Sequence, residues 1–167
     1  MRITAEIHYP APSDDVAHML ATEEYLRERI TFGGATVDQV NVVGTPEEGF
    51  TATTRGQLPS DAIPANMRSF VGSTLELRQV EVWEAPEEDG SRRATVVIEI
   101  AGAPVRLTGT RHIRPNDEGT CSDAVEGQLK ASVPLLGPSI EKAAAPAVYA
   151  ALDAEHKAAE RWLTDQG

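Results

Sequence analysis

The feature that most constrains the fold is a long run of alternating segments that ends in one long apolar-striped segment. Between residues 35 and 133, apolar and polar residues alternate in stretches separated by glycine, proline or asparagine. Period-two alternation is typical of strands with one buried face. Residues 2–8 alternate in the same way. The predicted strands are 2–8, 35–43, 49–58, 74–84, 92–101, 104–114 and 120–133.

The last segment, about 138–164, predicts a single helix of roughly 40 Å. Its opening Gly137-Pro138-Ser139 suits a helix start, because proline is accepted in the first turn, and Pro146 is expected to kink the helix. Two short helices are predicted after the first strand, capped by Ser13 and Thr22. Only the last helix is long enough to cover the apolar face of the sheet. We therefore expect a curved antiparallel sheet wrapped around that helix.

The order strand, two helices, six strands and long helix predicts one α+β domain over residues 1–167. It resembles the helix-grip fold of the START and birch-pollen-allergen superfamily, also called SRPBCC or polyketide-cyclase-like. The resemblance implies a cavity between sheet and helix that holds lipids, sterols, polyketides or plant hormones.

The chain is also similar to an uncharacterised actinobacterial START-like family, and this narrower resemblance implies no activity. The segments that carry it are Pro64 through Gly72, Gln79-Val80-Glu81-Val82-Trp83, Gly102-Ala103-Pro104-Val105, Val133-Pro134-Leu135-Leu136-Gly137, Ile140-Glu141-Lys142 and Arg161-Trp162-Leu163.

Charge and composition exclude several classes of partner. The net charge of -11 would repel phosphate backbones and anionic lipid surfaces, so no nucleic acid is expected. No apolar stretch approaches the roughly 20 residues of a membrane-spanning helix, and the N-terminus is patterned as a strand. We expect a cytoplasmic protein without stable membrane insertion. The outward strand faces are too polar for a large apolar interface, which predicts a monomer or a weak homodimer.

Metal and cofactor chemistry find no support in the sequence. The single cysteine, Cys121, cannot form an internal disulfide or a cysteine metal cluster. The four histidines lack the spacing of a metal site, and no glycine-rich phosphate loop or nucleophile elbow is present. We expect no cofactor, no metal and no catalytic residue of these classes.

Three predicted elements carry a polar residue on their apolar face. Gln79 and Glu81 share a strand face with Trp83, and Arg111 shares one with Leu107. At 100° per residue, Glu155 falls inside the apolar stripe of the last helix. That stripe is predicted to contain Ile140, Ala144, Ala147, Val148, Ala151, Ala158, Ala159 and Trp162. A charge on such a face costs several kcal/mol unless it is paired or used.

Turn lengths give expected registers for the two strand residues. Counting through the turns at Gly90 and Gly102 puts Glu81 and Arg111 two strands apart and offset, so no direct contact is expected. Counting through Gly119 puts Arg111 opposite Asp123. Arg111 is then a structural partner of Asp123, an anchor for an acidic ligand head, or misassigned in its facing.

Three interpretations of Glu155 remain open. It pairs with an arginine such as Arg111 or Arg55, it contacts a ligand in a cavity, or a kink at Pro146 exposes it. The small alanines of the stripe, including Ala151, leave space against a curved sheet, although close packing explains them equally. Trp83 fits a core residue better than a ligand platform.

The sequence favours a carrier or sensor for a mostly apolar small molecule, such as a lipid, a sterol or a polyketide-like compound, entered past residues 59–73. The predicted ligand-binding residues are Gln79, Glu81, Trp83, Arg111, Ala151 and Glu155. One alternative is a polyketide cyclase, dehydratase or hydrolase that uses Glu81 or Glu155 as general acid or base. It lacks a second catalytic group, which makes an enzyme the weaker reading. The other is an interaction protein with a vestigial cavity.

Overall fold

The computed structural model describes residues 1–59, 61, 63–72 and 74–166 and contains one antiparallel sheet. Its seven strands follow the order β1-β7-β6-β5-β4-β3-β2. They are β1 (Arg2–Tyr9), β2 (Thr36–Thr45), β3 (Gly49–Leu58), β4 (Leu75–Trp83), β5 (Arg92–Ala101), β6 (Val105–Pro115) and β7 (Cys121–Ala131). Every predicted strand is present, with ends that shift by at most two residues.

Three helices accompany the sheet: α1 (Ser13–Leu20), α2 (Glu23–Phe32) and α3 (Gly137–Asp165). The predicted side-chain caps are wrong. Ser13 is the first residue of α1 and its hydroxyl donates to the carbonyl of Gly90, while the Thr22 hydroxyl donates to the carbonyl of His18. Thr22 is the N-cap residue of α2, but its side chain makes no capping hydrogen bond, and the N-cap residue of α1 is Pro12.

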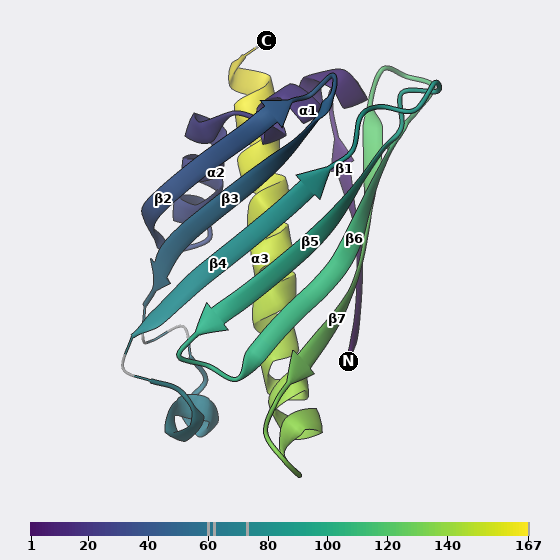
Figure 1. Cartoon of the computed structure of the whole chain (residues 1–167). Coiled ribbons are helices and arrows are strands. Elements are labelled where there is room, and N and C mark those ends of the chain that lie inside the picture. The colour runs from purple at the N-terminus through teal and green to yellow at the C-terminus, as the bar shows by residue number, and fades with distance from the viewer. Residues whose placement is uncertain (60, 62, 73, 167) are drawn as a thin grey trace.

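The long helix α3 crosses one face of the sheet, and α1 and α2 lie at the end that carries the C-terminus of α3 (Figure 1). At this end the core is closed. Val16, Leu20, Tyr25 and Leu26 have no exposed surface, as their helical spacing predicts. The Trp162 ring meets Tyr25 edge-on with centroids 5.6 Å apart, which makes it a core residue. The fold class predicted from the sequence is confirmed.

The opposite end of the sheet is more open. Residues 59–73 include a short 3-10 helix, η2 (Ala65–Phe70), and the Gly72 amide donates to the carbonyl of Gly102 in the β5–β6 turn at 2.7 Å. Inward-facing apolar side chains near this turn are only half-buried. They are Leu77, Ile98, Ile100, Val105 and Leu107 on the sheet and Val148 and Leu152 on α3. We call this set of half-buried residues the apolar groove.

The buried face of α3 is rotated from the predicted stripe. Ala147 and Ala151 are exposed, whereas Ala145, Glu155 and Ala159 are buried. At 100° per residue the buried residues of α3 are centred roughly 30° round the helix from the predicted centre, and Ile140 and Ala158 of the predicted stripe are buried as expected. Alanines bury little on any side, so they gave little information on the phase. Within the described residues, no helix is long and apolar enough to cross a membrane.

Candidate ligand-binding site

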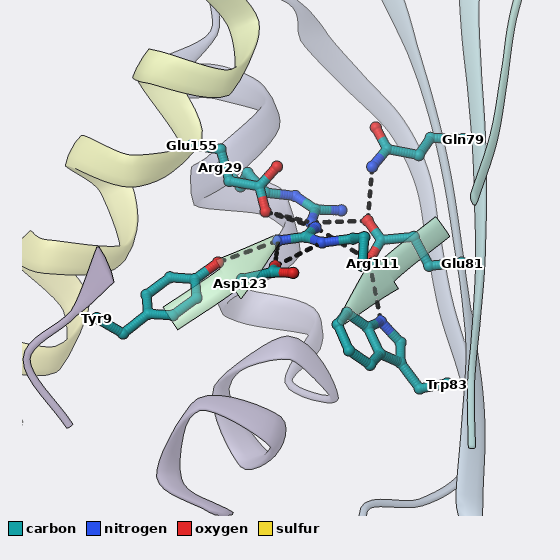
Figure 2. Close-up of polar contacts among 8 residues, drawn as sticks. All are labelled: Tyr9, Arg29, Gln79, Glu81, Trp83, Arg111, Asp123 and Glu155. Atoms are coloured by element: carbon teal, nitrogen blue, oxygen red, sulfur yellow. Dashed lines mark hydrogen bonds and ion pairs between the residues drawn. The ribbon is translucent and has the colours of Figure 1, made fainter. Parts of the chain in front are cut away.

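A cluster of five buried ionisable side chains lies between the sheet and the helices (Figure 2). Arg29 comes from α2, Glu81 from β4, Arg111 from β6, Asp123 from β7 and Glu155 from α3. None of the five residues, taken with its backbone, is more than 7% exposed. We call these five residues the ion cluster. Every layer of the molecule contributes to it, so the cluster forms only when the whole chain has folded.

Arg111 is the centre of the ion cluster, as Figure 2 shows. Its Nε and Nη2 both donate to Oδ2 of Asp123, at 2.8 and 2.5 Å. Nη2 also donates to the Tyr9 hydroxyl at 3.0 Å, and Nη1 lies 2.7 Å from Oε1 of Glu155 and 3.4 Å from Oε2 of Glu81. The predicted structural pair of Arg111 with Asp123 is present. All three guanidinium nitrogens are engaged, so Arg111 has little capacity left for an acidic ligand.

Two predicted relations of Arg111 are wrong. It does contact Glu81, because both long side chains point to the concave face of a curved sheet, and that curvature brings them together across two strands. In the ladder it lies opposite Val125, while Asp123 is opposite Ile113. The loop spans residues 116–120, one position later than predicted, and a shift of one residue moves each pair by two.

Arg29 supplies the second positive charge of the ion cluster. Its Nη1 lies 2.8 Å from Oε1 of Glu81 and 3.5 Å from Oε1 of Glu155. Arg29 was not among the predicted site residues. A signal was present, because Tyr25, Leu26, Arg29 and Ile30 follow helical i, i+3, i+4 spacing and place Arg29 on the apolar face.

Glu155 is buried, so the phasing that put it on the inner face of α3 is confirmed. Its partners are Arg111, as one interpretation predicts, and Arg29. The other predicted partner, Arg55, instead lies 3.4 Å from Glu76 near the surface. Pro146 does not expose Glu155, because the helix continues through it from Gly137 to Asp165.

Neutral side chains complete the coordination of Glu81. The Gln79 amide donates to its Oε1 at 2.6 Å, and the Trp83 indole donates to its Oε2 at 3.0 Å. The Trp83 ring stacks on Phe50, and the Arg111 guanidinium lies over the Trp83 ring, 5.4 Å from its centroid. Trp83 is therefore part of the core, and Glu81 is held by two charges and two hydrogen bonds.

The pKa values of two carboxyl groups in the ion cluster, Glu81 and Asp123, are shifted in opposite directions. Burial acts to raise the pKa of Glu81, but Arg29 and Arg111 outweigh it and lower that pKa to about 2. Burial raises the pKa of Asp123, and Arg111 opposes the rise only in part.

A cavity of about 40 Å³ adjoins the ion cluster. Its polar lining consists of Gln79, Thr110, Arg111, Glu126 and Glu155, and its apolar lining of Ile3, Val96, Ile98, Leu107, Val125 and Leu152. This volume holds only one or two water molecules, so side chains fill most of the space that the fold was expected to leave open. The cavity continues into the apolar groove through Ile98, Leu107 and Leu152.

The six predicted site residues thus fall into three groups. Gln79, Arg111 and Glu155 line the cavity, whereas Glu81 and Trp83 lie behind Arg111. Ala151 is exposed on the outer side of α3 and does not belong to the site.

Several buried polar atoms around the ion cluster have no hydrogen-bond partner among the described residues. They are Tyr25 Oη, Arg29 Nη2, Thr54 Oγ1 and Asp123 Oδ1. Buried polar groups are nearly always satisfied in folded proteins, and an exception marks a place where a water or a ligand group can act. Within the described residues, no three His, Cys, Asp or Glu side chains are grouped as a metal ion would require.

Comparison with known proteins gives one family match by sequence and many by structure. A family model described as a protein of unknown function, DUF2505, matches residues 4–163. No curated protein matches the chain. A protein from Rhodobacter sphaeroides has a TM-score of 0.62 at 14% identity, with 99% of this chain and 93% of that chain covered.

Two further solved structures have a similar fold. A point mutant of norcoclaurine synthase from Thalictrum flavum, in complex with a transition-state analogue, has a TM-score of 0.56 at 15% identity over 99% of this chain and 95% of that one. Ara h 8.0201 has a TM-score of 0.53 at 15% identity over 99% and 98%. At these identities the likeness shows the fold alone, and the helix-grip fold that the sequence resemblance implies is confirmed. The narrower actinobacterial resemblance stays a prediction.

Proposed function

The chain belongs to the DUF2505 family, and we propose that it binds a small, mostly apolar molecule that lies in the apolar groove with its polar head at the ion cluster. The observation that carries this proposal is the junction of two unlike surfaces. Half-buried aliphatic side chains lead inward from the open end of the sheet, and they stop at Gln79, Arg111 and Glu155. Ligand sites combine such an apolar wall with a few converging polar groups.

The cavity is too small to enclose a whole ligand, and this limits how a ligand can bind. A site for a drug-sized ligand measures roughly 300–1,000 Å³, far more than the cavity here. The body of the ligand would therefore lie in the open part of the apolar groove, or Leu152 and its neighbours would have to move. Residues 63–72 border the open end and would contact a ligand that enters there.

The fold of one structural neighbour supports a small-molecule ligand. The norcoclaurine synthase of similar fold was solved with a transition-state analogue, so this architecture holds a small molecule in one distant neighbour. Lipids, sterols and polyketide-like aromatics are the compounds we would examine first. We further propose that the chain acts in the cytoplasm as a single domain and as a monomer or weak homodimer, which light scattering would test.

Native mass spectrometry of freshly purified protein, followed by thermal-shift assays with lipids, sterols and polyketide-like aromatics, tests the proposal. We expect a co-purifying mass or a concentration-dependent rise in Tm with at least one class. A ligand that raises Tm should also change the fluorescence of Trp83, which contacts Arg111. Absence of any bound mass together with an unchanged Tm across all three classes would remove the function we propose.

A further inference from the structure

The ion cluster carries one more negative than positive side chain. Arg29 and Arg111 face Glu81, Asp123 and Glu155, all of them buried. The other side chains that complete the site are neutral. They are Tyr9, Tyr25, Thr54, Gln79 and Trp83. With every carboxyl group ionised, the buried site therefore has a local charge of about minus one.

This imbalance decides which head group the site accepts. Burying an uncompensated charge costs several kcal/mol, so a ligand that cancels the excess gains over one that adds to it. A carboxylate or phosphate would leave two guanidiniums against four or more negative groups. A single positive charge would balance the three carboxylates that are already present.

Glu155 is the carboxylate that a ligand in the groove would reach. It lines the cavity, and its side chain is 9% exposed, more than those of Glu81 and Asp123. Both of its arginine contacts use Oε1. Oε2 accepts no hydrogen bond from any described residue, and Figure 2 shows this oxygen turned away from Arg111.

Two neutral acceptors accompany Glu155. Tyr25 is fully buried, and its hydroxyl has no partner among the described residues. Glu155 is close enough to raise the pKa of Tyr25, second only to burial as a cause. Gln79 uses its NH2 group to donate to Glu81, so its carbonyl oxygen is free to accept at the cavity wall. A group with several N–H donors fits this arrangement.

From this charge balance and geometry we propose that the ligand of the apolar groove carries a protonated amine, which binds Oε2 of Glu155. This inference rests on the proposed function and narrows it to amphiphilic amines. The amine donates to the Glu155 carboxylate, with Gln79 as a further acceptor, and the apolar part lies against Ile98, Leu107 and Leu152.

The test compares three probes with one eight-carbon chain: octylamine, octan-1-ol and octanoate. Isothermal titration of the native protein near pH 7 should give octylamine an affinity about tenfold above octan-1-ol, and octanoate should bind most weakly. In Glu155→Gln the amine should lose about tenfold, whereas the alcohol should change less than about twofold. Glu160→Gln, an exposed carboxylate on the same helix, is the matched control and should keep the preference.

The outcomes of this test distinguish the amine inference from the proposed function on which it rests. If octan-1-ol or octanoate binds as tightly as octylamine, the amine inference is wrong and the groove still binds ligands. If none of the three probes binds, the amine inference is wrong, and the thermal-shift assays with lipids, sterols and polyketide-like aromatics decide whether the groove binds ligands. An amine preference that disappears equally in Glu160→Gln, or that raised salt abolishes, reflects only the net acidic charge and overturns the inference. Should Glu155→Gln fail to fold, the ranking of the probes on the native protein still decides.

Discussion

At the scale of single residues, Arg111 determines whether the interior is stable. It contacts all three buried carboxylates of the ion cluster and stacks on Trp83. A buried ion pair adds little net stability compared with an apolar replacement of both partners. Removing one partner is costly, however, because it leaves charges buried without compensation.

Replacing Arg111 by methionine should therefore lower the free energy of unfolding by about 3–5 kcal/mol, measured by urea denaturation. Arg106→Met is the control, because Arg106 is 56% exposed and meets Glu99 only at 3.4 Å. The control should change stability by less than about 0.5 kcal/mol. Equal effects of the two substitutions would contradict the central place of Arg111.

Glu81 should make the stability depend on pH in the acid range. Its pKa in the folded protein is about 2, against 4.5 for a free glutamate, because Arg29 and Arg111 overcome the effect of burial. A lowered pKa stabilises the fold above pH 4.5, and this stability is lost as the pH falls towards about 2. The loss amounts to about 3 kcal/mol, at about 1.4 kcal/mol per pKa unit.

The difference in unfolding free energy between native protein and Glu81→Gln isolates this contribution. It should be largest near pH 7 and should shrink steadily between pH 4.5 and about 2. Asp123 acts with the opposite sign, since its raised pKa favours the protonated folded state at low pH, but it is present in both proteins. Glu126→Gln, at a side chain that is 61% exposed, should give a difference that hardly varies with pH.

At this scale the sequence predicted which side chains are buried at the site, because the periodicity of strands and helices shows which residues share an apolar face. Glu81, Arg111 and Glu155 interrupt apolar faces of regular elements, so their burial was predictable. Their mutual contacts were not, because these depend on the curvature of the sheet and on a one-residue shift in the loop before β7. Arg29 showed the same interruption in α2, but a helix of only ten residues gives a weak pattern.

At the scale of elements, the phase of α3 determines which side chains meet the sheet. Glu155 and Ala159 lie near the centre of the buried face, and Ala151 lies outside it. The length of the helix was predictable from its composition and its boundaries. Its rotation was not, because alanines fit either face and the contacts with α2, β1 and β7 decide between them.

The rotation can be tested with one substitution at two places in the same helix. Ala159→Leu should lower the free energy of unfolding by about 1–3 kcal/mol, because Ala159 has no exposed surface and a larger side chain overpacks the core. Ala151→Leu should change it by less than about 0.5 kcal/mol. Leucine and alanine have similar helix propensities, so the difference reports packing alone. If Ala151→Leu lowered the free energy of unfolding more than Ala159→Leu, the helix phase predicted from the sequence would be correct.

At the scale of the whole molecule, the two ends of the sheet differ in burial and have different roles. The end covered by α1, α2 and the C-terminal part of α3 holds the buried core (Figure 1). The end at the β5–β6 turn keeps its aliphatic side chains half-exposed, and only a smaller apolar cluster forms around Ile3, Leu129 and Ala145. The closed end fixes the ion cluster in place, and the open end leaves it accessible from the apolar groove.

This division predicts that the groove can be blocked without loss of the fold. Leu152 borders both the cavity and the groove, so Leu152→Phe adds carbon atoms to a space of about 40 Å³. Filling an apolar cavity usually preserves or raises stability, so Tm should not fall. The affinity for octan-1-ol should decrease by about tenfold or more, measured by titration at constant pH.

The control for the blocked groove is Ala150→Phe, which adds an aromatic ring on the exposed side of the same helix. It should leave both Tm and affinity close to those of the native protein. If Leu152→Phe binds octan-1-ol normally while remaining folded, the ligand does not lie between α3 and the sheet. A binding site elsewhere on the molecule would then have to account for the affinity, and the ion cluster would have only a structural role.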